Sequence, residues 1–286
     1  MELEHIAQHS GRLSDFLRQE LRMSAGLMNR LKWGDGITVN GICRHTDYAV
    51  MPGDRIRVRL DEPAAEYPAE AGPLTVLYED DHLLMADKPA GMLIHPSRAQ
   101  NSGTLANRVL AHYRATGHDS AFHPVTRLDR DTFGIVLLAK NSHIHSLLQQ
   151  TGIRKTYHAL TFGGPAADCG IIDAPIARRP LPSLLRFVSP EGKPSVTEYE
   201  VLERSEMLCK LDLRPITGRT HQLRLHCAHM GWPILGDPQY NSPESVEFSQ
   251  EFGLKSQLLC AKSLEFHHPI TDEPILCHSR LEAKLP

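Results

Sequence analysis

The residues best placed to do chemistry lie in the segment TRLDRDTFG, residues 126–134. Its central carboxylate, Asp129, follows Arg127 by two residues and directly precedes Arg130. In an extended or turn conformation Arg127 can lie on the same side as Asp129, and a nearby guanidinium favours the ionised carboxylate. A nucleophile or general base needs that form at neutral pH. From the charge pattern alone, however, a salt-bridged surface turn is the more common meaning of such a triplet.

A second polar cluster lies in RPITGRTHQLRLHCAHMG, residues 214–231. The pattern predicts a strand that ends near Pro215, a Thr-Gly turn and a helix over 220–231. The side chains that crowd the start of this helix are Arg219, Thr220, His221, Gln222 and Arg224. Free backbone N–H groups at a helix N-terminus, beside two arginines, suit a phosphate or a carboxylate.

A metal site in this cluster is not expected. His221, His226 and His229 lack the i, i+4 spacing and the glutamate of a zinc-protease helix. Arg224 would also repel a cation. We therefore predict no metal ligands here.

The surrounding sequence predicts an α+β fold that positions both clusters on a long, mostly antiparallel sheet. The apolar run 134–140 is suited to a central strand, and 74–96 predicts two buried strands around an Asp-Asp turn. Alternating patterns predict antiparallel strands over 156–164, 194–204 and 208–216. Helices are expected over 104–115 and 143–150.

The N-terminal part predicts a separate small module. Apolar residues at helical spacing over 13–21 and 27–33 predict two short helices, and 37–41 with 54–60 predict a small hairpin sheet. A segment rich in Pro, Ala and Glu follows, and its composition predicts a linker. The expected organisation is a module at 1–62, a linker at 63–73 and a larger domain at 74–286.

Composition narrows the class of protein. The chain has 286 residues, 41% hydrophobic and 23% charged, which excludes wholesale disorder. No transmembrane run or secretory signal is found, and six scattered cysteines are typical of reduced thiols in a cytoplasmic protein. The net charge is −3, yet residues 11–60 hold nine basic and five acidic side chains. Such asymmetry favours contact of this segment with a polyanion.

Over residues 74 to about 280 the chain resembles the RluA-type family of pseudouridine synthases. The family signature around its catalytic aspartate is His-Arg-Leu-Asp-Arg-x-Thr-Ser-Gly, and residues 126–134 match it except at Thr126 and Phe133. The further matching blocks are DKPAG (87–91), HPS (95–97), KTY (155–157), GKPSVTEYEV (192–201), TGRTHQLRLH (217–226), ILGDPQY (234–240) and LCAKSLEFHHPIT (259–271).

The resemblance implies an isomerase that converts uridine in RNA to pseudouridine, with no cofactor and no metal. Asp129 corresponds to the catalytic aspartate that attacks the target uridine, at ribose C1′ or at base C6. Tyr157 corresponds to the tyrosine that stacks on the base, and Arg219 to the arginine that pairs with the aspartate. Leu223 corresponds to the apolar residue against the base, and Arg127 to the residue that fills the space of the flipped nucleotide.

Other polar residues of the two clusters, Arg130, Thr220, His221 and Arg224, are expected to bind the RNA. The replacements at Thr126 and Phe133 are expected to affect base selection or loop packing more than activity. The N-terminal module resembles the S4 RNA-binding domain through GRLSDFL (11–17), LKWGDGITVNG (31–41) and PGDRIRV (52–58). Ribosomal RNA is expected as substrate ahead of tRNA, with the protein acting as a monomer.

Two other readings remain open at this point. Asp129-Arg130-Asp131 is superficially similar to the DxDxT signature of haloacid-dehalogenase phosphatases. That signature needs threonine where Phe133 stands, and its strand precedes the aspartates, whereas here the apolar strand follows them. The more serious alternative is a catalytically silent RNA-binding paralogue, which the replacements at Thr126 and Phe133 would permit.

Overall fold

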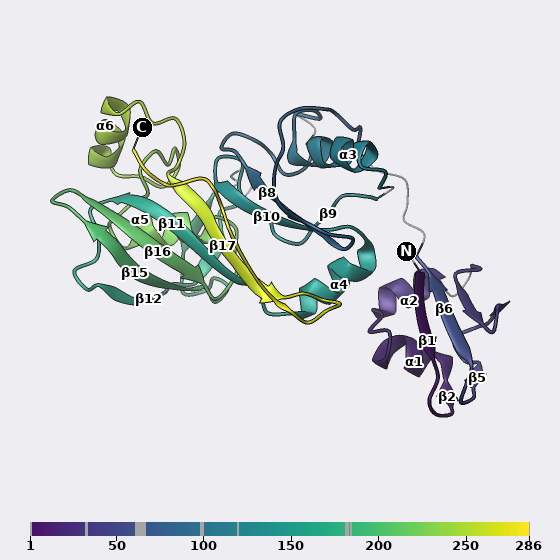
Figure 1. Ribbon diagram of the computed structural model, residues 1–286. Coiled ribbons are helices and arrows are strands. Elements are labelled where there is room, and N and C mark those ends of the chain that lie inside the picture. The colour runs from purple at the N-terminus through teal and green to yellow at the C-terminus, as the bar shows by residue number, and fades with distance from the viewer. Residues whose placement is uncertain are drawn as a thin grey trace.

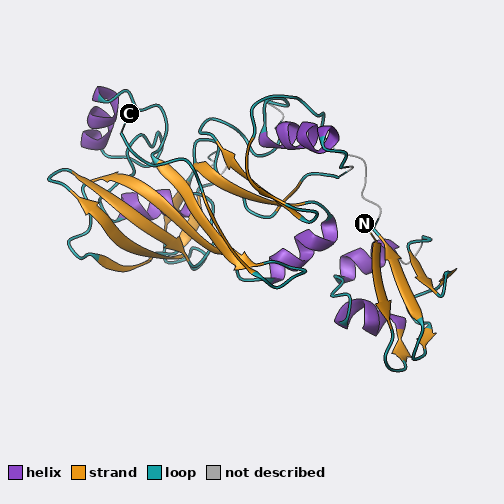
Figure 2. Cartoon of the chain, viewed as in Figure 1, coloured by secondary structure: helices purple, strands orange, loops and turns teal. Residues whose placement is uncertain are grey.

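The computed structural model describes residues 2–31, 34–60, 67–97, 100–118, 120–180, 183 and 185–285. Its N-terminal part is a four-stranded antiparallel sheet in the order β1-β6-β3-β4, accompanied by two helices (Figures 1 and 2). The elements of this part are β1 Glu2–Ile6, β2 Gly11–Arg12, α1 Leu13–Gln19, α2 Ala25–Leu31, β3 Ile37–Val39, β4 Ile42–Cys43, β5 Ala49–Val50 and β6 Arg55–Arg59.

This part has its own hydrophobic core. Leu13, Phe16 and Leu17 are buried on one face of α1, as i, i+3, i+4 spacing requires, and alternate residues of β6 are buried against them. Strand β1 was not predicted from the sequence because its short ELEHI run is largely polar and has no fully buried residue. Pairing with β6 creates it, with Glu4 accepting a hydrogen bond of 2.7 Å from Arg57.

The chain that follows the N-terminal part is tied to helix α3 (Leu105–Ala115). The expected linker spans 63–73, of which 63–66 lie outside the described residues. Beyond them, the Asn107 side chain donates to the carbonyl of Pro68 at 2.8 Å, and the Glu70 N–H donates to the carbonyl of Asn107. The later half of the expected linker is therefore packed against the larger part of the chain.

The larger part is built on one ten-stranded sheet, in the order β12-β15-β16-β11-β17-β10-β8-β7, with β18 on β17 and β9 on β10. All its pairings are antiparallel except β10 with β17, so the expected α+β architecture with a mostly antiparallel sheet is confirmed. Its strands are β7 Thr75–Glu79, β8 Leu83–Lys88, β9 His123–Pro124, β10 Phe133–Ala139, β11 Arg154–Phe162, β12 Cys169–Asp173, β15 Val196–Arg204, β16 Leu208–Pro215, β17 Leu259–His267 and β18 Pro274–His278. A separate hairpin joins β13 Ile176–Arg178 to β14 Arg186–Val188.

The parallel contact between β10 and β17 is short. Only Phe133 pairs with Cys260 and Gly134 with Ala261. Gly134 has φ +108°, and a Cβ there would lie 2.3 Å from the carbonyl oxygen of Ala261. Glycine is therefore required where the two central strands first meet, directly after the 126–134 segment.

Helices cover different faces and regions of this sheet (Figure 1). Helix α3 packs on the side of Leu84, Val136 and Leu138, whereas α4 (Ser142–Gln150) packs on the opposite side, against Leu83, Met85, Ile135 and Leu137. Helix α5 (Gln222–His229) covers β11 and β16, and α6 (Pro243–Glu251) follows it. Within the described residues, none of the helices has the length and apolar character needed to cross a membrane. All six cysteines are free; Cys209, Cys227 and Cys260 are buried, whereas Cys43 and Cys169 are exposed.

Candidate active site

A cavity of about 1010 Å³ opens where the β9–β10 loop faces the start of α5. The loop brings the 126–134 segment from one half of the sheet, and α5 brings the 214–231 cluster from the other. Every residue that the sequence analysis assigned to the site lines this cavity, namely Arg127, Asp129, Arg130, Tyr157, Arg219, Thr220, His221, Leu223 and Arg224.

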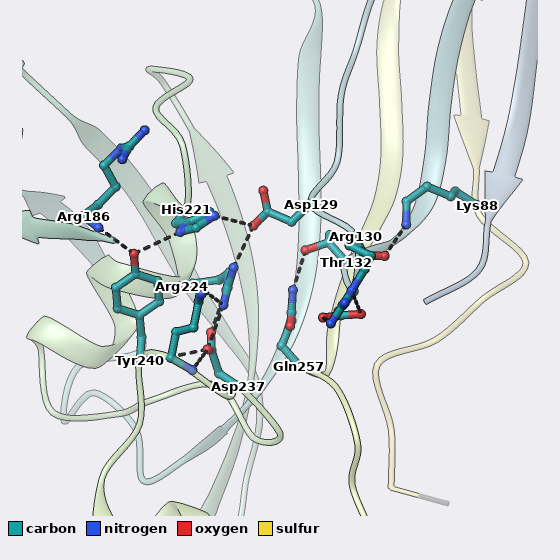
Figure 3. Close-up of polar contacts among 12 residues, drawn as sticks. Lys88, Asp129, Arg130, Thr132, Arg186, His221, Arg224, Asp237, Tyr240 and Gln257 are labelled. Atoms are coloured by element: carbon teal, nitrogen blue, oxygen red, sulfur yellow. Dashed lines mark hydrogen bonds and ion pairs between the residues drawn. The ribbon is translucent and has the colours of Figure 1, made fainter. Parts of the chain in front are cut away.

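The loop that carries Asp129 is fixed at both ends. At its start, the hydroxyl of buried Thr126 accepts a hydrogen bond of 2.9 Å from the Leu137 N–H of β10. At its end, the hydroxyl of buried Thr132 accepts one of 3.1 Å from the Gln257 side chain (Figure 3). The 126–134 segment is thus held by hydrogen bonds at both ends, and a reactive group is positioned better on such a segment than on a free loop.

Lys88, at the end of β8, supports the middle of the loop. Its buried ammonium donates to three carbonyl oxygens, those of Pro89, Met92 and Arg130, at 2.8–3.0 Å. Burial lowers the pKa of Lys88 to about 8, against the opposing charges of Asp131 and Asp129. The side chain is therefore mostly protonated at pH 7 and satisfies backbone groups that no strand pairs.

Asp129 is held by a buried arginine. Arg224 Nη1 donates to Asp129 Oδ2 at 3.0 Å, and the same guanidinium makes two bonds of 2.7 and 2.8 Å to the fully buried Asp237 (Figure 3). A bidentate pair fixes a guanidinium in orientation as well as in position. Burial by itself would lower the pKa of Arg224, but the two carboxylates raise it overall. Asp129 thus faces a permanent positive charge.

The expected pairing of Arg219 with Asp129 is wrong. Arg219 is exposed, and its Nε donates to the carbonyl of Pro194 at 3.2 Å. The reason is the start of α5: His221 has φ +57°, in the left-handed region, so the helix begins at Gln222 and not at 220. Arg219 therefore precedes the helix, while Arg224 lies on its buried face.

The neighbours of Asp129 in the chain do not pair with it either. Arg127 is exposed and makes no hydrogen bond or ion pair with any described residue. The Arg130 side chain pairs with Asp131 at 2.9 Å. The cation that balances Asp129 comes from α5, 95 residues away in sequence, a contact that local spacing cannot indicate.

His221 is the second polar neighbour of Asp129, with its Nε2 3.9 Å from Oδ2. Its Nδ1 lies 2.9 Å from the Tyr240 hydroxyl, which also accepts a bond of 3.0 Å from the Arg186 N–H. Because that hydroxyl accepts from a backbone amide, its own proton is available for His221 Nδ1. Donation of that proton to Nδ1 corresponds to the neutral ring that carries its own proton on Nε2, the atom that faces Asp129. Burial lowers the pKa of His221, although the Asp129 charge opposes the shift.

Tyr157 and Leu223 form the apolar part of the cavity. Both belong to the hydrophobic core formed by β11, β16 and α5. Burial, together with the charge of Asp129, raises the pKa of the Tyr157 phenol, so it stays protonated at neutral pH. A flat ring beside a carboxylate provides a surface on which a base can stack.

The two departures from the family signature have separate packing roles. Thr126 supplies the hydroxyl that anchors the loop on Leu137. Phe133 packs into a small cluster with Cys260 and Ala283, on strand β17 and near the chain end. Both side chains are at least nine-tenths buried. Their positions agree with an effect on loop packing.

Three residues of this site had no role in the sequence analysis. Lys88, Asp237 and Tyr240 support the loop, Arg224 and His221 respectively. Lys88 belongs to DKPAG, and the other two belong to ILGDPQY. Those blocks carried the family resemblance, and that was the available signal. In the described part of the chain, no group of three or more His, Cys, Asp or Glu residues could hold a metal ion.

Comparisons with known proteins point to one family. Residues 82–229 match the family model of the RNA pseudouridylate synthase domain. A similar curated protein is the uncharacterized RNA pseudouridine synthase YjbO of Bacillus subtilis strain 168, which is 37% identical over 92% of this chain and 93% of that protein.

Another relative is the ribosomal large subunit pseudouridine synthase C of Vibrio cholerae serotype O1 (strain El Tor Inaba N16961). It is 31% identical over 96% of this chain and 90% of that protein. Among solved structures, human RNA pseudouridylate synthase domain containing 1 matches with a TM-score of 0.59 and 22% identity. That match covers 75% of this chain and 92% of the human chain, and it supports the fold.

Proposed function

The chain belongs to the RNA pseudouridylate synthase family and forms pseudouridine in RNA, and from this premise we propose that Asp129 is its nucleophile and ribosomal RNA its substrate. The two proposals have different support. The first rests on the geometry around one carboxylate, and the second on relatives and on the N-terminal module.

The observation that carries the nucleophile is the unequal environment of the two Asp129 oxygens. Oδ2 accepts from Arg224 and faces His221, whereas no described residue donates to Oδ1. The side chain is 30% exposed, in a cavity large enough for a nucleotide. One oxygen is therefore anchored and the other is open to a substrate, as a carboxylate nucleophile requires.

The reaction moves one glycosidic bond and leaves the atom count unchanged. Attack by Asp129 at ribose C1′ or at base C6 allows the bond between C1′ and N1 to break. The uracil turns and C5 bonds to C1′. The bond to Asp129 breaks, either from C1′ as C5 attacks or from C6 by elimination afterwards, and this restores the carboxylate. The C5 proton leaves and N1 gains a proton. Tyr157 and Leu223 hold the detached base by stacking and packing, so that it can turn without leaving the cavity.

The target must leave its helix to reach this cavity, because a stacked base is inaccessible. Unstacking costs on the order of a few kcal/mol. Arg127 stands at the cavity, exposed and without a partner among the described residues. It is the side chain best placed to occupy the space that the flipped nucleotide vacates.

Ribosomal RNA is proposed as the substrate on two grounds. One relative is named a ribosomal large subunit enzyme and matches nearly the whole chain. The N-terminal part, with its excess of basic residues over 11–60, supplies a phosphate-binding surface of the kind that S4-like modules provide. Base contacts in the cavity would then select the uridine.

The test is pseudouridine mapping of total RNA at single-nucleotide resolution, in cells with and without the gene. We expect one or a few ribosomal sites to disappear and to return with wild type but not with Asp129→Asn. RNA affinity of Asp129→Asn should stay within a few-fold of wild type. Near-normal turnover by this variant would exclude Asp129 as the nucleophile.

The same experiment tests the alternative that the chain is a catalytically silent RNA-binding paralogue. Unchanged maps would be followed by turnover assays on unmodified ribosomal RNA and tRNA in vitro. RNA binding without isomerisation, unaffected by Asp129→Ala, would favour the binding protein. Sites lost from tRNA only would overturn the choice of ribosomal RNA and leave the nucleophile unaffected.

A further inference from the structure

A second cavity, of about 510 Å³, lies beside the catalytic one. Gly218, Arg219 and Thr220 line both, so the two are continuous along the turn that precedes α5. The other walls come from the β13–β14 hairpin and from the segment 191–193. A strand that places one nucleotide at Asp129 can continue into this space.

The second cavity is strongly basic. Its charged lining consists of Arg178, Arg186, Lys193, Arg219 and the single carboxylate Glu191. Arg178 and Arg186 stand directly opposite each other in the β13–β14 register. Like charges at directly opposed positions destabilise a strand pair, so this hairpin gains stability when an anion lies between the two.

Several exposed arginines of the chain are paired with carboxylates. Arg57, Arg204 and Arg214 each pair with a carboxylate at 3.0 Å or less. By contrast, Arg178, Lys193 and Arg219 make no ion pair with any described residue. The positive charges of these three side chains are therefore not neutralised by those parts of the chain that the structure describes.

The backbone that carries these cations is fixed. Ile176 and Lys193 exchange two backbone hydrogen bonds of 2.9 and 3.0 Å. A Cβ on Gly192 would lie 2.6 Å from the backbone of Ile176, so only glycine allows this approach. The turn that carries Arg219 is held by Gln222, whose side-chain oxygen accepts from the Arg219 N–H at 3.0 Å. The charges thus have a defined arrangement.

We propose that this cavity is a phosphate-binding subsite for the RNA backbone next to the target uridine. The inference rests on the proposed function, because the ligand is the continuation of the substrate strand. Arg178 and Lys193 supply the contacts, and the subsite sets how the strand enters the catalytic cavity. The Arg186 N–H, on the same hairpin, bonds to the Tyr240 hydroxyl beside His221, so the subsite is joined to the active site by backbone.

The test compares two double variants that each remove two positive charges. Arg178→Gln/Lys193→Gln changes the subsite. Lys255→Gln/Lys284→Gln is the matched control, since both lysines are exposed, make no ion pair with a described residue and lie outside both cavities. The probe is a fluorescein-labelled oligouridylate of about 12 nucleotides, long enough for a binding groove of ordinary site size. Its affinity is measured between about 50 and 200 mM NaCl.

For the subsite variant we expect binding about tenfold weaker at the lowest salt. We also expect a log–log salt dependence shallower by about 1.4, since each contact to a single strand contributes about 0.7. The control should match wild type. On a substrate RNA the subsite variant should raise KM and keep kcat.

Equal losses in both double variants would mean that only overall charge matters, and would overturn the proposal. So would unchanged binding by the subsite variant, or no saturable binding of the probe by wild type. Inorganic phosphate in place of chloride, at equal ionic strength, should not compete further. Strong competition would assign the cavity to a free phosphate. None of these binding measurements requires pseudouridine to form, so inactivity of wild type would count against the proposed function alone.

Discussion

At the scale of single residues, the position of Asp129 depends on a carboxylate that does not line the cavity. Asp237 is fully buried and holds Arg224 through two hydrogen bonds. It also accepts from the N–H groups of Gln239 and Tyr240 at 2.8 and 3.0 Å. Asp237 therefore fixes the Arg224 guanidinium, and Arg224 in turn positions Asp129.

Asp237→Asn should destabilise the protein by about 3 kcal/mol, because it leaves a buried guanidinium without its main partner. Turnover should also fall, since Arg224 no longer has a fixed orientation. Asp129→Asn is the matched comparison, because it keeps the Arg224–Asp237 pair and should unfold close to wild type. Urea denaturation measures both free energies of unfolding. If the two variants had equal free energies of unfolding, Asp237 would not be the main partner that stabilises buried Arg224.

The acid limb of activity should depend on Tyr240. Its hydroxyl lies 2.9 Å from His221 Nδ1 and can donate to that nitrogen only while the ring is neutral, and burial also lowers the pKa of His221. Wild-type turnover should hold from pH 7 to below the ordinary histidine pKa of about 6.5 and decline as His221 gains a proton. Tyr240→Phe removes the donor and should move this decline to higher pH.

The control for that measurement is Tyr113→Phe. Tyr113 is also buried, but its hydroxyl has no hydrogen-bond partner among the described residues, and it lies outside the cavity that contains Asp129. Its pH profile should coincide with that of wild type. A profile for Tyr240→Phe that also coincides with wild type would show that His221 does not govern the acid limb.

At the scale of secondary-structure elements, the meeting of β10 and β17 places the catalytic loop. Gly134→Ala should cost at least about 2 kcal/mol, from a strained φ and from contact of the new Cβ with the Ala261 carbonyl. Gly152→Ala is the control, because a Cβ there meets nothing within 4 Å and φ is ordinary. Thermal unfolding of the two variants measures the difference in stability. Similar melting temperatures would show that the contact between β10 and β17 tolerates a side chain at position 134.

The sequence predicts the elements whose apolar pattern is continuous. β10 was expected at 134–140 and lies at Phe133–Ala139, and α3, expected at 104–115, begins after the Thr104 cap. β17 was not assigned, although it is a central strand, because LCAKSLEFH mixes polar and apolar residues without a clear period. Burial of its polar positions is decided by neighbours that are distant in sequence.

The residues of the site could be predicted from the sequence, but their contacts could not. Family motifs identified the residues that line the cavity, because each motif is local. They could not identify which arginine meets Asp129, because that depends on the left-handed His221 and on the packing of α5. The prediction that Arg219 pairs with Asp129 failed at this step.

At the scale of the whole molecule, the N-terminal part has a core that shares no residue with the cores of the larger sheet. We propose that it binds RNA independently of the chemistry. Deletion of residues 1–66 should therefore raise KM for RNA more than it lowers kcat. Steady-state kinetics on an RNA substrate provide the measurement. An unchanged KM would remove this part of the chain from substrate binding.

The strand order of the large sheet also has a consequence for synthesis of the protein. The loop that carries Asp129 is held by the hydrogen bond from Gln257 to Thr132, and these two residues are 125 positions apart in the chain. Asp87 accepts a hydrogen bond from Ser279, which is 192 positions further along. At ribosomal speeds of about 5–20 residues per second, the first gap alone lasts roughly 6 to 25 s. The N-terminal part is complete long before then. If the N-terminal part binds RNA, a nascent chain can therefore do so before the Asp129 loop is braced, and a chain that ends before Gln257 carries Asp129 and Arg224 without that brace.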